Sequence, residues 1–252
     1  MRVWDCQKLV MPPKIKDGAI FIADAHENEK RGFLWEFLCE IERENIKPSS
    51  LFLMGDMFDL LVGQIQSTHG FAREYIQKLD HISQEIPVYY FEGNHDFNLK
   101  TLFSNVKVFS IQDQPAIFQS KAGNILLSHG DSYEDIKYKI YTFLIRNNFI
   151  CKALNLINEI SNHIFCNKII SHQHTKNICK KIDNFQEKIS LKLPKYNLEN
   201  TKAIIEGHYH QNQSFMYKNI LYFNLASFAC SKSYFVANFS DGISFDEIKF
   251  KV

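Results

Sequence analysis

Five short polar clusters recur along this 252-residue chain, and their side chains are of the types that bind metal ions. Most of the clusters follow a short hydrophobic run that predicts a buried strand. Because such strands end at one edge of a sheet, we expect the Asp, Asn and His side chains to converge there. The clusters are Asp24-Ala25-His26, Gly55-Asp56, Gly93-Asn94-His95-Asp96, His129-Gly130-Asp131 and Gly207-His208-Tyr209-His210. The hydrophobic runs are residues 19–23, 51–54, 88–92, 125–128 and 203–206.

Oxygen and imidazole ligands without thiolates suit a borderline divalent metal such as Mn, Fe, Zn, Co or Ni. Asp24 and His26 are two residues apart, so on an extended chain their side chains could point the same way. The candidate ligands are too many for one tetrahedral ion but enough for two ions that share a bridging carboxylate. Two metals about 3.5–4 Å apart are typical of phosphoryl-transfer sites. The candidates are Asp24, His26, Asp56, Asn94, His129, His208 and His210.

Each of these residues, taken alone, could also have a purely structural role and bind no metal. An Asp at a strand end is often a helix N-cap, and a single His is often a surface or core residue. The order of five clusters, most of them after a predicted strand, favours the metal centre. His172 and His174 lie instead in a Lys-rich stretch without a preceding strand or glycine, and we expect them in a solvated helix or loop. The same expectation covers His69, His81 and His163.

In this order the five clusters resemble those of the calcineurin-like metallophosphoesterase superfamily, from residue 20 to about residue 225. The resemblance implies an α/β fold, a β-sheet sandwich flanked by helices. It implies that His95 stands beside the scissile phosphate as general acid or charge stabiliser, oriented by Asp96. It also implies two metal sites that share a bridging Asp56. One would contain Asp24, His26, Asp56 and His210, and the other Asp56, Asn94, His129 and His208.

Length and composition agree with a soluble enzyme, and we expect one domain over residues 1–252. The chain is 45% hydrophobic and 23% charged, which are ordinary globular values. A net charge of +1 gives no case for a nucleic-acid partner. We also expect no obligate protein partner. The six cysteines show no paired spacing, so we expect reduced thiols. We expect no signal peptide, and no apolar stretch reaches the about 18 residues of a spanning helix.

Strand and helix patterns alternate through the first half of the chain. Helices are predicted near residues 29–44 and 71–83, the second ending before Pro87. This alternation favours mostly parallel strands with helices on the sheet faces. After Gly207 the pattern changes to short strands at 220–224, 234–239 and 243–250, and Asp241-Gly242 predicts a hairpin turn between the last two.

About 70 residues separate the fourth and fifth of these clusters, His129-Gly130-Asp131 and the one that begins at Gly207, and we define residues 132–200 as an insert within the domain. Residues 138–160 and 164–189 predict two helical regions, and the first is apolar on more than one face. One interpretation is a helical hairpin packed on the core. The other is a lid over the active site, whose apolar inner face meets a greasy substrate while nearby lysines meet phosphates. The lysines are Lys168, Lys176, Lys180, Lys181 and Lys188.

The insert makes the chain similar to the UDP-2,3-diacylglucosamine hydrolases of lipid A biosynthesis, which carry helical inserts at this point. The matching residues are Phe91-Glu92-Gly93-Asn94, Asp96-Phe97, His129-Gly130-Asp131, Asp135, Tyr138, Phe143 and Arg146-Asn147. The chain differs in that His95 stands where the best-known branch has Arg, and residues 60–63 lack a Trp.

This second resemblance implies hydrolysis of the pyrophosphate of UDP-2,3-diacylglucosamine to UMP and 2,3-diacylglucosamine 1-phosphate. It implies two divalent ions, with Mn²⁺ expected, and substrate contacts from Tyr138, Phe143, Leu144 and Arg146. It also implies a cytoplasmic protein with peripheral contact to the inner membrane. The alternatives are a phosphoesterase or phosphodiesterase acting on a soluble phosphate ester or nucleotide and, with less support, a non-catalytic scaffold.

Overall fold

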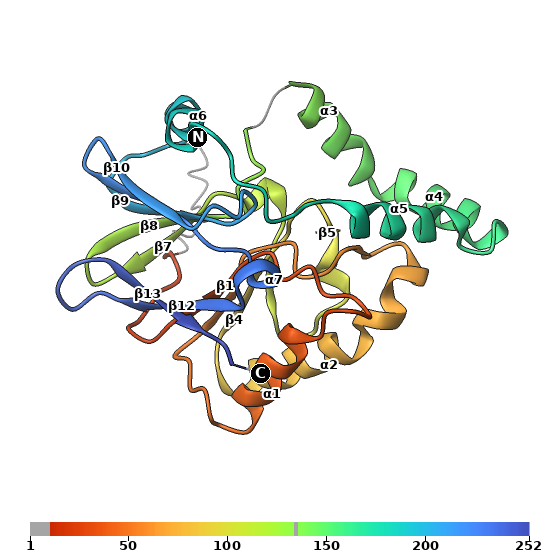
Figure 1. Cartoon of the computed structure of the whole chain (residues 1–252), viewed down its shortest axis with the longest axis horizontal. Helices are drawn as coiled ribbons and strands as arrows, with labels where there is room; N and C mark the ends of the chain where they lie inside the picture. The colour runs from red at the N-terminus through yellow and green to blue at the C-terminus, as the bar shows by residue number, and fades with distance from the viewer. Residues whose placement is uncertain (1–10, 134–135, 252) are drawn as a thin grey trace, which may run out of the picture.

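Two β-sheets form the centre of the computed structural model, which describes residues 11–133 and 136–251 (Figure 1). The first has six strands in the order β13-β12-β1-β2-β4-β6, and the second has five in the order β10-β11-β9-β8-β7. In the first sheet β1, β2, β4 and β6 run parallel, and in the second β11, β9 and β8 do. The other neighbours in these two sheets pair antiparallel.

The strands have the following bounds. The first sheet contains β1 (Ile20–Ile22), β2 (Leu51–Leu53), β4 (Val88–Phe91), β6 (Lys107–Phe109), β12 (Ser233–Asn238) and β13 (Ser244–Lys249). The second contains β7 (Ala116–Ser120), β8 (Gly123–Ser128), β9 (Thr201–Glu206), β10 (Gln213–Tyr217) and β11 (Ile220–Asn224). A separate parallel pair is formed by β3 (Leu61–Val62) and β5 (Asp96–Phe97).

Alternation along the strands builds a layered core, because successive side chains point to opposite faces of a sheet. Phe21 and Phe52 pack between the two sheets, where their rings stack at a centroid distance of 4.4 Å. Their neighbours Ile22 and Leu53 point outward to helices α1 (Phe33–Glu42) and α2 (His69–Glu85). On the far face of the second sheet, Ile204 packs against helix α6 (Phe185–Lys192). The fold is therefore an α/β sandwich of two sheets flanked by helices, as the sequence predicts.

Most predicted elements appear within one or two residues of their expected bounds. The hairpin at Asp241-Gly242 joins β12 to β13, and α1 buries Leu34, Phe37 and Leu38 as its apolar spacing requires. Among the described residues, the strands β3, β5, β6, β7 and β10 have no counterpart in the predicted set. The remaining helical elements outside the insert are α7 (Phe228–Ser231) and the 3₁₀ turns η1 (Gln66–Thr68), η2 (Leu99–Thr101) and η3 (Ile111–Asp113), and the turn η4 (Leu193–Lys195) lies within the insert.

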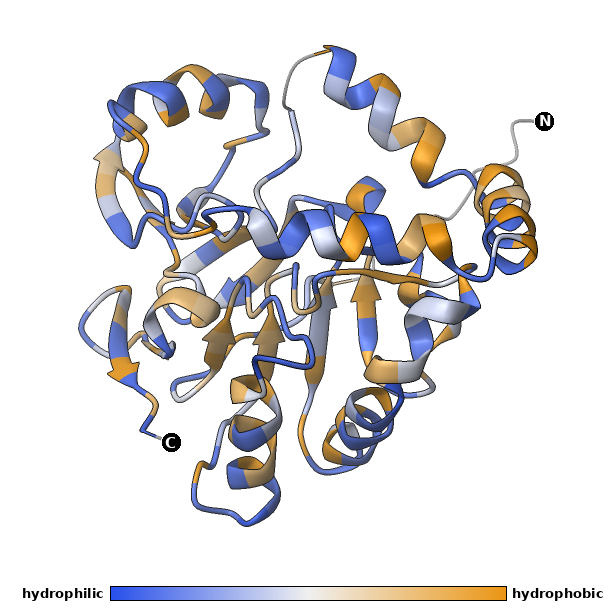
Figure 2. Ribbon diagram, turned by 45° about the vertical axis from the view of Figure 1, so that its right-hand side comes forward, coloured by the Kyte–Doolittle hydropathy of each residue, from blue (hydrophilic) through white to orange (hydrophobic). Residues whose placement is uncertain are grey.

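The insert contains helices α3 (Ile136–Ile145), α4 (Asn148–Ile160), α5 (Ile164–Thr175) and α6. The first three extend away from the sheets, and Figure 2 shows many hydrophobic residues along them. The predicted helical region 164–189 is wrong as one continuous element, because residues 176–184 are not helical. The helix ends where Lys176 turns extended, and Asn184 adopts a left-handed conformation (φ 54°) before α6. No helix in the described part of the chain is both long and apolar enough to cross a membrane.

The expectation of six reduced cysteines is wrong for two of them. Cys179 and Cys230 form a disulfide that joins the insert to α7. They are separated by 51 residues, so their spacing in the sequence carries no trace of their contact in space. Cys39, Cys151 and Cys166 are free thiols, and Cys6 lies outside the described residues.

Candidate metal centre

Strands from both sheets end at one place in the sandwich, and the polar clusters follow them. In the first sheet, β1, β2 and β4 run parallel, and their carboxyl ends precede Asp24, Asp56 and Asn94. In the second sheet, the parallel strands β8 and β9 precede His129 and His208. The topology therefore brings together the side chains that the sequence places up to 186 positions apart.

Two groups of potential metal ligands form at these strand ends. One contains Asp24, His26 and His210, and the other contains Asp56, His129 and His208. Within each group, one ligand atom from each residue lies within 4.8 Å of the others. The His95 ring, which belongs to neither group, lies beside the first group, with its centroid 5.0 Å from that of His26. Six of the seven candidate ligands thus lie in two clusters; Asn94 is the seventh.

Specific contacts fix the ligand atoms within each group. Nε2 of His210 lies 3.0 Å from Oδ1 of Asp24, and Nε2 of His129 lies 3.4 Å from Oδ2 of Asp56. The backbone amide of His208 donates to Asp24 at 2.9 Å, which links the two groups. These side chains are nearly all buried, so their polar atoms need partners.

Several buried ligand atoms have no hydrogen-bond partner within the protein. They are both ring nitrogens of His26, Nε2 of His129, Nδ1 of His208 and Oδ1 of Asn94. Leaving a buried polar atom unpaired is costly, and a cluster of such atoms at one place is rare in folded proteins. Divalent metal ions would bind one ring nitrogen of each histidine and the amide oxygen of Asn94, and the set of carboxylate, amide and imidazole donors suits them. The residues present therefore fit a metal centre.

The backbone is strained at most of the candidate ligands. Five of the seven have a left-handed φ between 45° and 63°, a conformation that is uncommon outside glycine. Strain of this kind persists where the surrounding structure holds it, and it gathers at functional sites. The five are Asp24, His26, Asp56, His208 and His210.

Glycines allow the clusters to approach one another closely. A Cβ atom on Gly93 would lie 2.2 Å from Oδ1 of Asp56, and one on Gly55 would lie 2.3 Å from Nδ1 of His129. Both distances are far below van der Waals contact, so a side chain at either position would displace a candidate ligand. These two positions require glycine because of close approach.

Burial and neighbouring charges shift the pKa values of the ligands. Burial alone would raise the pKa of the Asp56 carboxyl, but the charges of His129 and His95 hold that pKa well below its usual range. Burial lowers the pKa of His26, and burial together with the charge of His129 lowers that of His208 well below its usual range. Low pKa values keep both rings neutral near pH 7, and a neutral imidazole is the form that binds a metal.

His95 lies at the site with its ring held from one side. Its Nδ1 is 2.9 Å from the backbone carbonyl oxygen of Asp59, and its Nε2 is 4.0 Å from Oδ2 of Asp56. A carbonyl oxygen only accepts hydrogen bonds, so Nδ1 must carry the hydrogen. Nε2 is then the ring nitrogen that faces the site.

Asp96 does not make the contact that we expected with the His95 ring. Its carboxylate instead accepts hydrogen bonds from the backbone amides of Asp56, Met57 and Gly93 and from the Tyr90 hydroxyl, at 2.6–2.9 Å. Burial raises the pKa of Asp96 to about 7. The Asp96 side chain shapes the turns that present Asp56 and Asn94. The carbonyl of Asp59, and not Asp96, orients the His95 ring.

The predicted substrate residues fall into two sets. Tyr138 and Arg146 point into the protein, where the Tyr138 hydroxyl and Arg146 Nη2 both contact Oδ2 of Asp131, at 3.0 and 3.3 Å. Arg146 Nη2 also donates to the carbonyl of Gly93 at 2.7 Å, next to Asn94. Phe143 and Leu144 are exposed.

Asp59 contacts the site although it was not among the predicted residues, and His174 makes a contact that was not predicted. The Asp59 carboxylate lies 3.4 Å from Nδ1 of His26 and accepts from Asn28 and Arg31. The one sequence feature that could have pointed to Asp59 was its position three residues after the candidate ligand Asp56. His172 and His174 lie exposed on helix α5, as predicted. Nε2 of His174 nevertheless contacts Asp59 at 3.2 Å.

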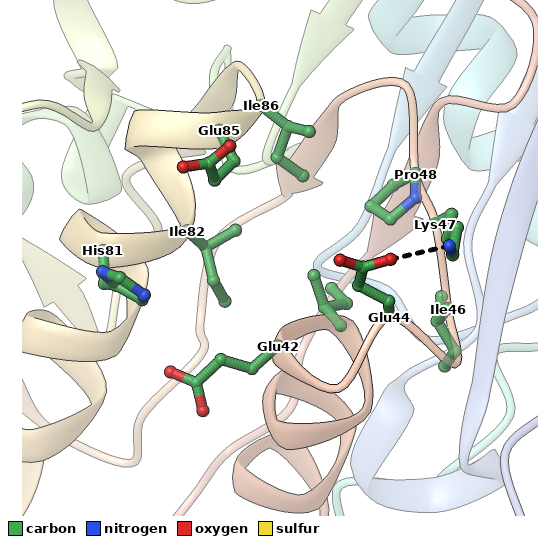
Figure 3. A pocket seen from close by; sticks show the side chains of 10 residues that line it. Glu42, Glu44, Ile46, Lys47, Pro48, His81, Ile82, Glu85 and Ile86 are labelled. Atoms are coloured by element: carbon green, nitrogen blue, oxygen red, sulfur yellow. Dashed lines mark hydrogen bonds and ion pairs between the residues drawn. The ribbon is translucent and has the colours of Figure 1, made fainter.

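A cavity of about 350 Å³ lies away from these clusters, between the carboxyl ends of α1 and α2 (Figure 3). Its lining includes Glu42, Glu85 and His81. It adjoins Pro48 and Ile86, just before the amino ends of β2 and β4, whereas the candidate ligands follow the carboxyl ends. This cavity is therefore not part of the metal centre.

Comparison with known proteins agrees with the geometry. Residues 19–212 match the model of the family described as calcineurin-like phosphoesterase. A UDP-2,3-diacylglucosamine hydrolase from Coxiella burnetii (strain RSA 493 / Nine Mile phase I) is 26% identical over 198 residues, covering 76% of this chain and 80% of that protein. The protein of the same name from Proteus mirabilis (strain HI4320) is 24% identical over 197 residues, covering 76% and 81%. A dimetal phosphatase structure from Danio rerio superposes with a TM-score of 0.46 at 14% identity, covering 93% of this chain and 100% of that one.

Proposed function

Because the chain belongs to the calcineurin-like phosphoesterase family, we propose that it hydrolyses the pyrophosphate bond of UDP-2,3-diacylglucosamine to UMP and 2,3-diacylglucosamine 1-phosphate. Metal-dependent phosphohydrolysis follows from the family. The substrate is the further step, and the names of the relatives from Coxiella and Proteus support it. The observation that carries the proposed substrate is an apolar surface on the insert. The insert begins shortly after the candidate ligand His129.

The apolar surface consists of exposed hydrophobic side chains on α3, α4 and α5. Phe143 is 70% exposed, Phe149 83% and Ile160 76%. A monomeric protein rarely exposes a contiguous apolar patch larger than a few hundred Å², and larger ones mark binding sites for apolar partners. The other members are Ile136, Ile140, Tyr141, Leu144, Leu154, Leu156, Ile157, Ile164, Phe165 and Ile169. Two acyl chains are an occupant of matching chemistry.

Two cavities connect the insert to the core. One of about 280 Å³ lies at the start of the insert and is lined by Asp131, Tyr138 and Phe143 among others. The other, of about 360 Å³, lies between α5 and the core and is lined by Phe58, Phe71 and Ile170 among others. Each cavity is lined by a residue that is linked to the metal centre. In the first cavity this residue is Asp131, which contacts Arg146, and in the second it is Asp59. A substrate with a polar head at the centre and apolar chains under the insert fits this arrangement.

Two divalent ions held by the candidate ligands would supply the Lewis acidity that activates water and neutralises charge on phosphate oxygens. Mn²⁺ is the ion we propose, within the set that carboxylate and imidazole donors favour. We assign Asp24, His26, Asp56 and His210 to one site and Asp56, Asn94, His129 and His208 to the other. Asp56 is then the residue common to both.

The remaining residues act on the substrate directly. Nε2 of protonated His95 can donate a proton to the departing phosphate oxygen, while Nδ1 keeps its bond to the Asp59 carbonyl. Arg146 is buried, and its Nε and Nη1 have no partner within the protein. A guanidinium with free donors beside Gly93 suits a phosphate oxygen, because charge-assisted bonds to phosphate are strong. We therefore assign Arg146 to the substrate phosphate and Tyr138, Phe143 and Leu144 to the sugar and acyl portion.

The same apolar surface supports peripheral contact with the cytoplasmic face of the inner membrane. A diacylated substrate resides in a bilayer, and exposed residues such as Phe149 and Ile160 can insert among acyl chains without any spanning helix. Lys168, Lys176 and Lys180 lie in the same part of the insert and would face anionic headgroups.

The test compares two substrates with the Mn²⁺-loaded protein. We expect kcat/KM for UDP-2,3-diacylglucosamine to exceed that for deacylated UDP-glucosamine by about 100-fold or more, since each buried CH₂ contributes about 0.8 kcal/mol. Equal efficiency would instead indicate a phosphodiesterase for soluble nucleotides. No hydrolysis of either substrate, or of a small chromogenic phosphodiester, would indicate a non-catalytic scaffold.

A further inference from the structure

We propose that residues 174–179, here called the strap, position both histidine ligands of one metal site and thereby couple the insert to that site. The strap runs from the last turn of α5 into the following loop. Neither histidine contact was expected from the sequence. The inference rests on the metal-dependent activity of the centre but not on the identity of the substrate.

The first contact runs from His174 to His26 through Asp59. Nε2 of His174 lies 3.2 Å from Oδ2 of Asp59, and Oδ1 of Asp59 lies 3.4 Å from Nδ1 of His26. The Asp59 side chain is only 5% exposed, and the 29% exposed imidazole of His174 meets it from the insert. A carboxylate behind a metal-bound histidine fixes the ring orientation and the nitrogen that faces the metal. His174 is thus a positioning residue that acts through Asp59.

The second contact comes from the backbone of the strap. The carbonyl oxygen of Ile178 accepts a hydrogen bond from Nδ1 of His210. This bond leaves Nε2 of His210 directed at Asp24, which it meets at 3.0 Å. A backbone carbonyl in this role has the same effect as the carboxylate behind His26, because it fixes both the tautomer and the ring plane.

The disulfide fastens the strap beside the third ligand of the same group. Cys179 directly follows Ile178, and Cys230 lies in α7. The neighbouring residues of α7 hold the backbone of Asp24, since the Ser227 hydroxyl and the Ala229 amide donate to the Asp24 carbonyl at 2.8 and 3.2 Å. The strap is therefore connected to all three ligands of this group. It contacts His210 directly, it contacts His26 through Asp59, and the disulfide joins it to the helix beside Asp24.

The second group of ligands takes its support from the core instead. Nδ1 of His129 lies 2.8 Å from the carbonyl of Met54 at the end of β2, and Oδ1 of Asp56 accepts from the His95 amide at 2.8 Å. The two metal sites thus differ in what holds them. Displacing the strap should weaken the site of Asp24, His26 and His210 and spare the site of His129 and His208.

The test measures metal content by equilibrium dialysis against graded Mn²⁺ concentrations. Wild type should bind two ions per chain. In His174→Ala one ion should bind as before and the other about 10- to 100-fold more weakly, the usual effect of losing a contact behind a ligand. His174→Gln, which keeps a side-chain donor, should recover part of the affinity. His172→Ala, on the same helix but outside the strap, should bind both ions like wild type.

The disulfide gives an independent test of the same strap. Cys230→Ser should weaken one metal site in the same way, because the Ile178 carbonyl loses its anchor. Cys39→Ser, which removes a free thiol on α1, should have no effect. Unchanged affinity for both ions in both His174→Ala and Cys230→Ser would overturn the proposal, and so would equal weakening of both sites, which indicates general loss of structure. Hydrolysis of only soluble substrates would overturn the proposed substrate but leave the selective metal loss intact.

Discussion

Oδ2 of Asp56 lies 3.4 Å from Nε2 of His129, although the two residues follow strands of different sheets. Asp56 comes after β2 in the six-stranded sheet, and His129 comes after β8 in the five-stranded sheet. The Asp56 carboxylate therefore connects the two sheets at the point where both groups of candidate ligands meet.

Asp56→Ala should remove nearly all activity and metal, because the proposed bridging ligand serves both sites. Metal analysis and turnover of a small chromogenic phosphodiester measure the two effects. His172→Ala is the control and should change neither. Wild type that binds at most one ion per chain at saturating Mn²⁺ would contradict the two-metal arrangement.

His95→Ala should keep both metals and lose about 10²–10⁴-fold in kcat, the usual effect of one positioned acid or base. Its ring touches the Asp59 carbonyl and faces Asp56 at 4.0 Å, so its removal leaves the ligand set in place. Metal content and kcat across neutral pH are the measurements. A kcat equal to that of wild type over this range would remove His95 from the chemistry.

Phe143→Asp and Leu144→Asp should raise KM for the diacylated UDP-sugar by about 10- to 100-fold. Burying one such side chain contributes about 1.5–3 kcal/mol, and 1.4 kcal/mol corresponds to a factor of ten. Hydrolysis of a small chromogenic phosphodiester should stay almost unchanged, because both positions lie on the insert and not among the metal ligands. Ile117→Asp, at an exposed position on β7, is a matched control.

The strands, the two sheet-facing helices and the five clusters were predictable because each depends on short-range patterns. Alternation along β1 separates Phe21 from Ile22, and the apolar spacing of Leu34, Phe37 and Leu38 defines the buried face of α1. The order of the clusters along predicted strands then places the candidate ligands at one edge.

Contacts across long sequence separations were not predictable in this way. The Cys179–Cys230 disulfide, the contact between His174 and Asp59, and the hydrogen bonds of Asp96 to the turn at Asp56 join segments with no shared pattern. The break after α5 was missed for a related reason. Lys-rich polar sequence is compatible with helix, and tertiary contacts decide where it ends.

Lys192→Met should lower the free energy of unfolding by about 3–5 kcal/mol and the Tm by roughly 6–20 °C. The Lys192 ammonium donates to Oε2 of buried Glu206 at 2.8 Å and to the carbonyl of Gly130 at 2.8 Å. Without it a carboxylate that also accepts from the Tyr196 and Tyr222 hydroxyls stays buried without its counter-charge.

Calorimetry or a thermal shift assay checks the change at Lys192. Lys195→Met is the control, since that side chain is exposed in the adjacent 3₁₀ turn. The double variant with Glu206→Gln should recover part of the loss, because both charges are then absent. A Tm unchanged in Lys192→Met would show that water or another cation compensates Glu206.

Glu247→Gln should reduce stability at pH 7 by about 1 kcal/mol and leave stability at pH 2 nearly unchanged. Burial opposes ionisation, but hydrogen bonds from Ser233, Lys249 and Asn212 outweigh it and lower the pKa of Glu247 from 4.5 to about 2. A carboxyl with a depressed pKa in the folded state stabilises the protein above about pH 4.5. That contribution is lost as the pH falls from 4.5 to 2. Urea unfolding of both proteins across this range measures it, and parallel pH profiles would contradict the assignment.

Asp24 and His208 are linked by a hydrogen bond across 184 residues, and this separation has a consequence for protein synthesis. At about 5–20 residues per second, a ribosome needs roughly 10–40 s to extend the chain from one partner to the other. During that interval β1 also lacks β12, its antiparallel neighbour in the finished sheet. During the same interval each group of candidate ligands lacks one of its histidines, His210 in the first group and His208 in the second. Selection of the correct metal has to occur after translation has passed residue 210, when both ligand sets first exist together.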